Sequence, residues 1–206
     1  MVKAFTLIEL LIVVAIIAIL AAIAVPNFLE AQTRSKVSRC RADMRTVVTA
    51  LESYRVDNPR YPMMNEVAAP GIPNPTFPFN DISAGGDDHA RVPSWLTTPI
   101  SYMTSIPNDP FVLREALLGQ TPQQLAVAQR YVYFNYDQFL ATFPGSASFL
   151  NRQADAGAWL IYGVGPDRDP LNLAAGAVYI NYDPTNGTIS GGNIFRTQRN
   201  NELYVD

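Results

Sequence analysis

The feature that most constrains this chain is an apolar run close to its N-terminus. Every residue from position 10 to position 25 is Leu, Ile, Val or Ala, and further apolar residues extend the run on both sides. The segment therefore reaches the roughly 20 residues that a helix needs to cross the hydrocarbon core of a bilayer. This pattern predicts a membrane-spanning helix.

One carboxylate, Glu9, lies near the start of the apolar run. An acidic side chain in hydrocarbon costs about 2.5 to 3.5 kcal/mol near a helix centre and less toward its end, so an intramembrane acid is a candidate functional residue. Two plain alternatives give Glu9 no role. One is a cleaved secretory signal, with Lys3 as its charged start and residues 22–24 as its cleavage site. The other is a simple single-pass anchor.

The residues around Glu9 also resemble the N-terminus of a known family. A short basic leader, the sequence Phe5-Thr-Leu-Ile-Glu9-Leu-Leu and a proline at position 26 are similar to type IV pilins and type II secretion pseudopilins. In that family a prepilin peptidase cuts after the leader and methylates the new N-terminal amine. The resemblance implies a leader of residues 1–4 and a cut between Ala4 and Phe5, where the family usually has Gly in place of Ala4.

What the resemblance implies about assembly has a physical basis. Cleavage creates an ammonium group at Phe5, and Glu9 of a neighbouring subunit can neutralise it where water is excluded. The family assembles as helical homo-oligomeric filaments, so the expected partners are further copies, the prepilin peptidase, an inner-membrane assembly platform and minor pseudopilins. Before assembly the chain is expected to contact membrane lipid. The expected location is the bacterial inner membrane, with one membrane span and the head in the periplasm or outside the cell.

The helical pattern continues beyond the apolar run. Between Val37 and Tyr54 apolar residues recur at intervals of three and four, which is typical of an amphipathic helix, and no breaker occurs before Asn58-Pro59. We therefore predict one helix over residues 5–55, with a membrane or filament-core half at 5–29 and an amphipathic half at 30–55. Pro26 removes a backbone hydrogen bond, so it is expected to kink or loosen the helix without ending it.

The remaining residues, 56–206, are predicted to form one globular head. Frequent prolines indicate a long irregular connection over residues 59–110, with short helical turns at 95–96 and 100–103. Aromatic and β-branched runs predict strands at 131–136, 158–164, 177–182 and 190–197, the last two joined by a hairpin turn at Asn186-Gly187. Weaker patterns indicate helix at 113–118 and 121–129. The predicted fold class is α+β, a long helix packed on a small antiparallel sheet within residues 131–197, as in the pilin-like fold.

Two further sites follow from individual residues. Cys40 is the only cysteine, so the chain has no intramolecular disulfide, and its place on the apolar helix stripe predicts a buried core residue. Asp167, Asp169 and Asp183 flank two turns from which carboxylates could bind calcium, as the resemblance to major pseudopilins also implies. The alternative is that these aspartates bond nearby backbone amides, as is usual at turns.

Composition and spacing disfavour an enzyme or a nucleic-acid-binding protein. The single histidine, His89, has no partners at metal-ligand spacing, and the net charge of −3 does not suit a phosphate-binding surface. The sequence is interpreted as a structural filament subunit, with the major pseudopilin of a type II secretion system as the first hypothesis. The alternatives are a pilin of a type IV pilus and a membrane-anchored binding module that does not polymerise.

Overall fold

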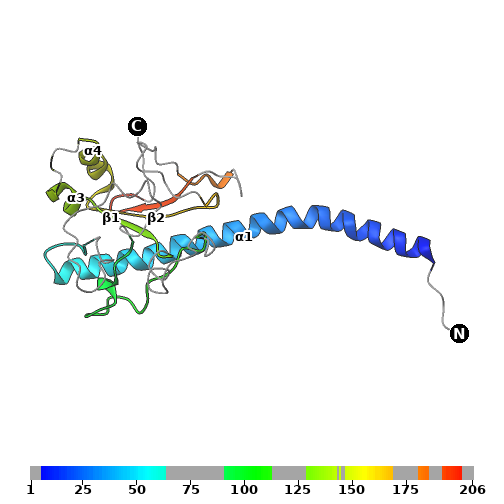
Figure 1. Cartoon of the computed structure of the whole chain (residues 1–206), viewed down its shortest axis with the longest axis horizontal. Helices are drawn as coiled ribbons and strands as arrows, with labels where there is room; N and C mark the ends of the chain where they lie inside the picture. Colours follow the sequence, from blue (N-terminus) through cyan, green and yellow to red (C-terminus); the bar gives the residue numbers. More distant parts are fainter. Residues whose placement is uncertain are drawn as a thin grey trace, which may run out of the picture.

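A computed structural model describes residues 6–63, 91–112, 129–142, 144, 147–168, 181–185 and 192–200. One long helix, α1 (Leu7–Asp57), lies along the length of the head with its C-terminal half and projects far beyond the head with its N-terminal half (Figure 1). At 1.5 Å per residue, its 51 residues span about 76 Å. The predicted helix over 5–55 is therefore present as one continuous element of nearly the same extent.

Pro26 lies inside α1 and does not end it. The helix follows a smooth curve in its N-terminal half rather than breaking into two rods (Figure 1). The helix continues because the missing N–H of a proline removes a single hydrogen bond, whereas the residues on both sides keep their own.

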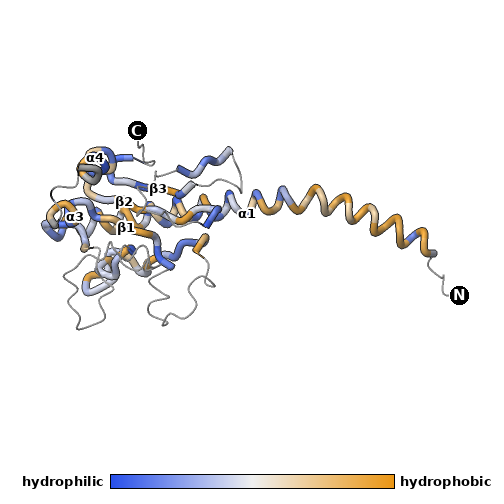
Figure 2. The backbone as a smooth tube through the Cα atoms, turned by 45° about the horizontal axis from the view of Figure 1, so that its top comes forward, coloured by the Kyte–Doolittle hydropathy of each residue, from blue (hydrophilic) through white to orange (hydrophobic). Residues whose placement is uncertain are grey.

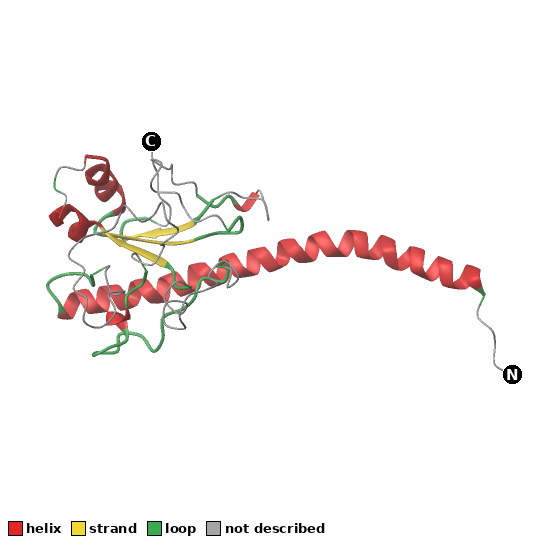
Figure 3. Cartoon of the chain, in the orientation of Figure 1, coloured by secondary structure: helices red, strands yellow, loops and turns green. Residues whose placement is uncertain are grey.

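Within the described ranges of the head, three short strands form a sheet. They are β1 (Val132–Asn135), β2 (Trp159–Gly163) and β3 (Ile194–Thr197), in the order β1-β2-β3. Both pairs are antiparallel, with Phe134 opposite Leu160 and Ile161 opposite Arg196. The sheet lies along the outer half of α1 (Figure 3). The α+β architecture expected from the sequence is thus confirmed.

Two helices between β1 and β2 were not predicted. They are α3 (Tyr136–Thr142) and α4 (Ala147–Ala156), at the end of the head furthest from the N-terminal half of α1 (Figure 3). The strand expected to include Tyr136 ends one residue earlier, because the Asn135 side chain accepts a hydrogen bond from the Gln138 N–H at 3.0 Å and so starts α3.

The antiparallel pairing expected for the hairpin around Asn186-Gly187 is contradicted where its two arms meet among the described residues. Asn181 and Asn193 form a parallel bridge, whereas a hairpin pairs its arms antiparallel. The chain crosses closely at Gly192, where a Cβ atom would lie 2.3 Å from the Asn181 carbonyl oxygen. Residues 177–180 and 186–191 lie outside the described part, as do the helix expected at 113–118, all but Gln129 of the helix expected at 121–129, and residues 64–90 of the Pro-rich connection. The turn expected at 95–96 is present as η3 (Ser94–Leu96).

The core forms between one face of α1 and the sheet. Hydropathy along the chain changes from continuously apolar in the first half of α1 to alternating in the second half (Figure 2). The buried α1 residues recur at intervals of three, four and one: Val37, Cys40, Met44, Val47, Ala50 and Leu51. From the sheet and its flanks, the largest fully buried side chains that meet them include Trp159, Tyr131, Tyr133 and Ile161.

Leu51, the last of these α1 residues along the chain, is fully buried, and Val56, five residues further along α1, is 84% exposed. We expect Leu51→Ala to lower the free energy of unfolding by about 2 to 5 kcal/mol, because it removes buried methyl groups and leaves a cavity. We expect Val56→Ala to change it by less than about 0.5 kcal/mol. Denaturant unfolding of the full-length chain in detergent, followed by tryptophan fluorescence, measures both; equal effects would contradict the assignment of this core.

Candidate assembly site on the N-terminal helix

The N-terminal half of α1 has an exposed surface on every side. All described residues from 6 to 29 are exposed, among them Leu7 at 85%, Ile17 at 59% and Phe28 at 62%. This part of α1 is long and apolar enough to span a membrane. An apolar surface of this size does not remain in water, so it must be covered by lipid or by other chains.

Glu9 takes part in the first turn of α1. Thr6 is the N-cap: its hydroxyl oxygen accepts a hydrogen bond from the Glu9 N–H at 3.3 Å. The Thr6 N–H and hydroxyl donate in return to Glu9 Oε2, at 2.9 and 2.8 Å. These reciprocal bonds form a capping box, in which Glu9 also faces the positive end of the helix dipole.

The capping box is a role of Glu9 that our sequence analysis missed. The signal was present, since Thr6-Leu7-Ile8-Glu9 has the spacing of the capping-box pattern, a hydroxyl residue followed three positions later by Glu. The second carboxylate oxygen, Glu9 Oε1, accepts no hydrogen bond from the residues that the structure describes. Ala4 and Phe5, the expected processing residues, lie outside those residues, so the cut between them stays a prediction.

Carboxylates on the outer half of α1 join the helix to the head. Glu52 accepts hydrogen bonds from the Trp159 indole N–H at 3.2 Å and from the Tyr61 hydroxyl at 3.0 Å. Burial, followed by the neighbouring Glu52 carboxylate, raises the pKa of Tyr61 to about 12, so the phenol remains a donor. Asp43 accepts from the Tyr131 hydroxyl at 3.1 Å. These hydrogen bonds help to fix the orientation of α1 on the head, which apolar packing alone does not do.

The aspartates expected to bind calcium are not brought together as a site. Asp183 Oδ1 accepts hydrogen bonds from the Thr185 N–H at 2.8 Å and from its hydroxyl at 2.7 Å, and these bonds lower the Asp183 pKa. Asp167 is exposed, and Asp169 lies outside the described residues. Among the described residues, no three acidic, histidine or cysteine side chains are close enough to hold a metal. Calcium binding stays a prediction.

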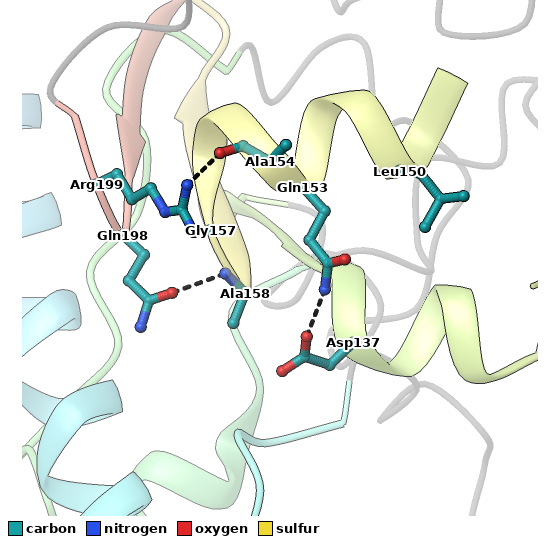
Figure 4. A pocket seen from close by; sticks show the side chains of 8 residues that line it. All are labelled: Asp137, Leu150, Gln153, Ala154, Gly157, Ala158, Gln198 and Arg199. Carbon is teal, nitrogen blue, oxygen red and sulfur yellow. Dashed lines mark hydrogen bonds between the residues drawn. The ribbon is translucent and has the colours of Figure 1, made fainter. Parts of the chain in front are cut away.

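A hollow of about 300 Å³ lies between the end of α4 and the residues that follow β3 (Figure 4). Its polar side chains bond across it: Gln153 donates to Asp137 at 2.6 Å, and Gln198 accepts from the Ala158 N–H at 2.7 Å. Arg199 donates to the Ala154 carbonyl at the end of α4. The Arg199 bond satisfies a carbonyl at the C-terminal end of α4, and the other two join neighbouring elements, which indicates a structural role for these residues. His89 lies outside the described residues.

Cys40 occupies the core as predicted, with no exposed surface. Burial raises the pKa of the Cys40 thiol to about 12, so almost none of it is the reactive thiolate at neutral pH.

We expect Cys40 of the folded chain to resist dithionitrobenzoate at pH 8 and to react with one equivalent after denaturation. The release of thionitrobenzoate, followed by absorbance, measures this difference. Rapid reaction of the native chain would show that the face of α1 that carries Cys40 is open to solvent.

Residues 1–25 match the family described as the prokaryotic N-terminal methylation motif. The chain is 33% identical over 201 residues to the type IV major pilin protein PilA of Myxococcus xanthus, covering 86% of this chain and 90% of that protein. It is 38% identical over 94 residues to the type IV wide pilus major component PilA4 of Thermus thermophilus, covering 44% of this chain and 71% of that protein.

Similarity also extends to secretion proteins. The chain is 36% identical over 72 residues to the type II secretion system core protein G of Pseudomonas aeruginosa, covering 35% of this chain and 51% of that protein. The chain thus matches about half the length of this protein. No solved structure matches the chain significantly.

Proposed function

The chain belongs to the family of type IV pilins and type II secretion pseudopilins, and from this membership we propose that it is the repeating subunit of a type IV pilus. The coarser statement, that it is a pilin-type filament subunit, follows from the family. The extent of the similarity supports the finer proposal: the match to a type IV major pilin covers 90% of that protein, whereas the match to the secretion protein covers 51% of its own length.

The uncovered half of α1 suits this function. Before assembly, residues 7–29 anchor the precursor in the inner membrane, with the short basic leader on the cytoplasmic side, as basic residues near a membrane span favour. In the filament, the same apolar surface packs against the helices of other copies. Because α1 is continuous, the head of each copy is carried at a set distance from this packed core.

In this proposal, Glu9 supplies the negative charge of an ion pair between neighbouring copies. Cleavage before Phe5 creates an ammonium group directly in front of the capping box. Glu9 uses Oε2 for the box, which leaves Oε1 to accept from the ammonium of a neighbouring copy. In an environment without water, this pair is much more favourable than either charge alone.

The second candidate is the major pseudopilin of a type II secretion system. The similarity to protein G favours it, as does the single cysteine, which excludes an intramolecular disulfide. Mechanical shearing of intact cells separates the two candidates: pilus subunits appear in the sheared material, whereas a periplasmic pseudopilus stays with the cells. Mass spectrometry of the same material shows whether the mature chain begins at Phe5.

Two substitutions separate the charge of Glu9 from its capping role. We expect Glu9→Gln to abolish most filament formation, because Gln keeps a capping oxygen for the Thr6 N–H and loses the negative charge. We expect Thr6→Val to leave most filament in place, because it removes only a cap worth about 1 kcal/mol. Filament is measured by immunoblot of the sheared material, and the amount of membrane-bound precursor serves as the control.

Normal filament from Glu9→Gln would contradict the charge pairing. If both variants lost filament equally while their precursor levels stayed normal, the role of Glu9 would be that of a helix cap. Absence of the wild-type chain from every filament fraction, despite correct processing, would contradict the filament function itself.

A further inference from the structure

One charged side chain of the sheet lacks a counter-charge. Arg196 of β3 is only partly exposed, and its Nε atom is buried. This nitrogen donates no hydrogen bond, and the Arg196 guanidinium forms no ion pair with any residue that the structure describes. Buried polar atoms in folded proteins are almost always hydrogen-bonded, so an exception of this kind calls for an explanation.

The sheet register places Arg196 on the face that packs on α1. Trp159 lies on this face, because its indole N–H donates to Glu52 of α1 at 3.2 Å. Side chains alternate between the two faces along a strand, so Ile161 shares the face of Trp159. Arg196 is directly opposite Ile161, and residues directly opposite one another in an antiparallel pair lie on the same face. The Arg196 side chain therefore leaves the sheet on the side of α1.

Two hydrogen bonds show which part of α1 lies level with the arginine of β3. Glu52 bonds to Trp159, at the start of β2, and Asp43 accepts from the hydroxyl of Tyr131, the residue before β1, at 3.1 Å. Because β1 and β2 are antiparallel, Tyr131 lies beside the far end of β2. The middle of the sheet, and with it the arginine of β3, therefore lies level with Val48, which is partly buried against the core.

A second arginine lies on the flank of α1 that faces the β3 side of the sheet. Asp43 meets the segment before β1, so the opposite flank of α1 lies on the side of β3, since the strands are ordered β1-β2-β3. At 100° per residue, Arg45 lies about 60° from Val48 around the helix axis, and Asp43 lies about 140° from Val48 in the other direction. Arg45 is thus the cation of α1 that is placed closest in level to the arginine of β3 on this flank.

Among the described residues, no carboxylate forms an ion pair with either arginine. Glu52 shares the flank of Arg45, but its carboxylate accepts hydrogen bonds from Trp159 and Tyr61. A guanidinium that loses part of its hydration without gaining a counter-charge is in an unfavourable state. The planar N–H donors of arginine match the oxygens of phosphate and sulfate, so an anion of this class would stabilise both side chains.

The position of the two arginines limits the source of such an anion. The exposed apolar segment ends near Leu29, nineteen residues before Val48, which corresponds to about 28 Å along the helix. The polar headgroup layer extends only about 5 to 8 Å beyond the hydrocarbon on each side. With the apolar half of α1 in a membrane, lipid phosphates do not reach the level of Val48. A small anion in solution is the source that this geometry favours.

We propose that Arg196 of β3, together with Arg45 of α1, binds a compact oxyanion such as inorganic phosphate or sulfate. The anion supplies the missing counter-charge and accepts hydrogen bonds from both guanidinium groups, with Nε of Arg196 becoming available as that guanidinium turns toward it. Binding joins β3 to the outer half of α1 and stabilises the folded head, because the site exists only in the folded chain. The inference concerns a single chain and does not depend on the proposed filament function.

Urea unfolding of the full-length chain in an uncharged detergent, followed by tryptophan fluorescence, tests this site. We expect the unfolding midpoint to rise to a plateau as phosphate or sulfate replaces chloride at constant ionic strength. A general salt effect would rise without saturation. In chloride, we expect Arg196→Met to unfold at the wild-type midpoint or above it, because it replaces an uncompensated charge by an apolar side chain. The midpoint of this variant should not respond to phosphate.

Two further variants measure the contribution of α1. We expect Arg45→Gln to weaken phosphate binding by roughly tenfold or more, the effect of losing one charge-assisted hydrogen bond. Arg60→Gln is the matched control: it neutralises an exposed arginine just after α1, outside the proposed site, and should bind phosphate as the wild type does. Calorimetric titration of each folded chain with inorganic phosphate gives the affinities.

Three outcomes would overturn the proposal. The first is a wild-type midpoint that reaches no plateau with phosphate or sulfate, and the second is an equal response from Arg196→Met. The third is stabilisation by vesicles that contain phosphatidylglycerol without any response to free phosphate, which would assign the arginines to lipid. If Arg196→Met does not fold, the titrations of the wild type and of Arg45→Gln decide: equal affinities would contradict the site, and a loss confined to Arg45→Gln would support it.

Discussion

The burial of one face of α1 against the three-stranded sheet is the contact on which the rest of the structure depends. It anchors a helix of 51 residues by its outer half alone, through Val37, Met44 and Leu51 and the aromatic residues that meet them. Because the helix is continuous, this contact also sets the direction in which the uncovered half projects from the head. The head and the apolar half are thus joined by one continuous helix, which Pro26 does not interrupt.

Polar bonds give this apolar contact its register. Hydrophobic burial is nondirectional, so by itself it would allow the helix to slide or rotate on the sheet. Glu52 is bonded to Trp159 on β2 and to Tyr61 in the segment after α1, and Gln198, which follows β3, donates to the same tyrosine at 2.8 Å. Any shift of the helix would leave these partly buried groups without partners, which costs more than the bonds themselves contribute.

The two halves of α1 are both helical but differ in how their apolar side chains are covered. The outer half covers its apolar stripe within one chain. The inner half leaves its entire surface exposed, and the capping box satisfies the backbone N–H groups of Thr6 and Glu9 at its start. The apolar surface of this half is therefore left for lipid or for other chains to cover.

By itself the sequence determined the long helix, its two halves, the burial of Cys40 and the three strands of the described sheet, because these depend on local periodicity and composition. It also contained the capping box, in the spacing of Thr6 and Glu9. Only the tertiary structure decided the helices that follow β1, the parallel crossing of Asn181 and Asn193, and the partners of Glu52. These features depend on contacts between residues far apart in the chain, such as Glu52 with Trp159, and local patterns do not record which distant groups meet.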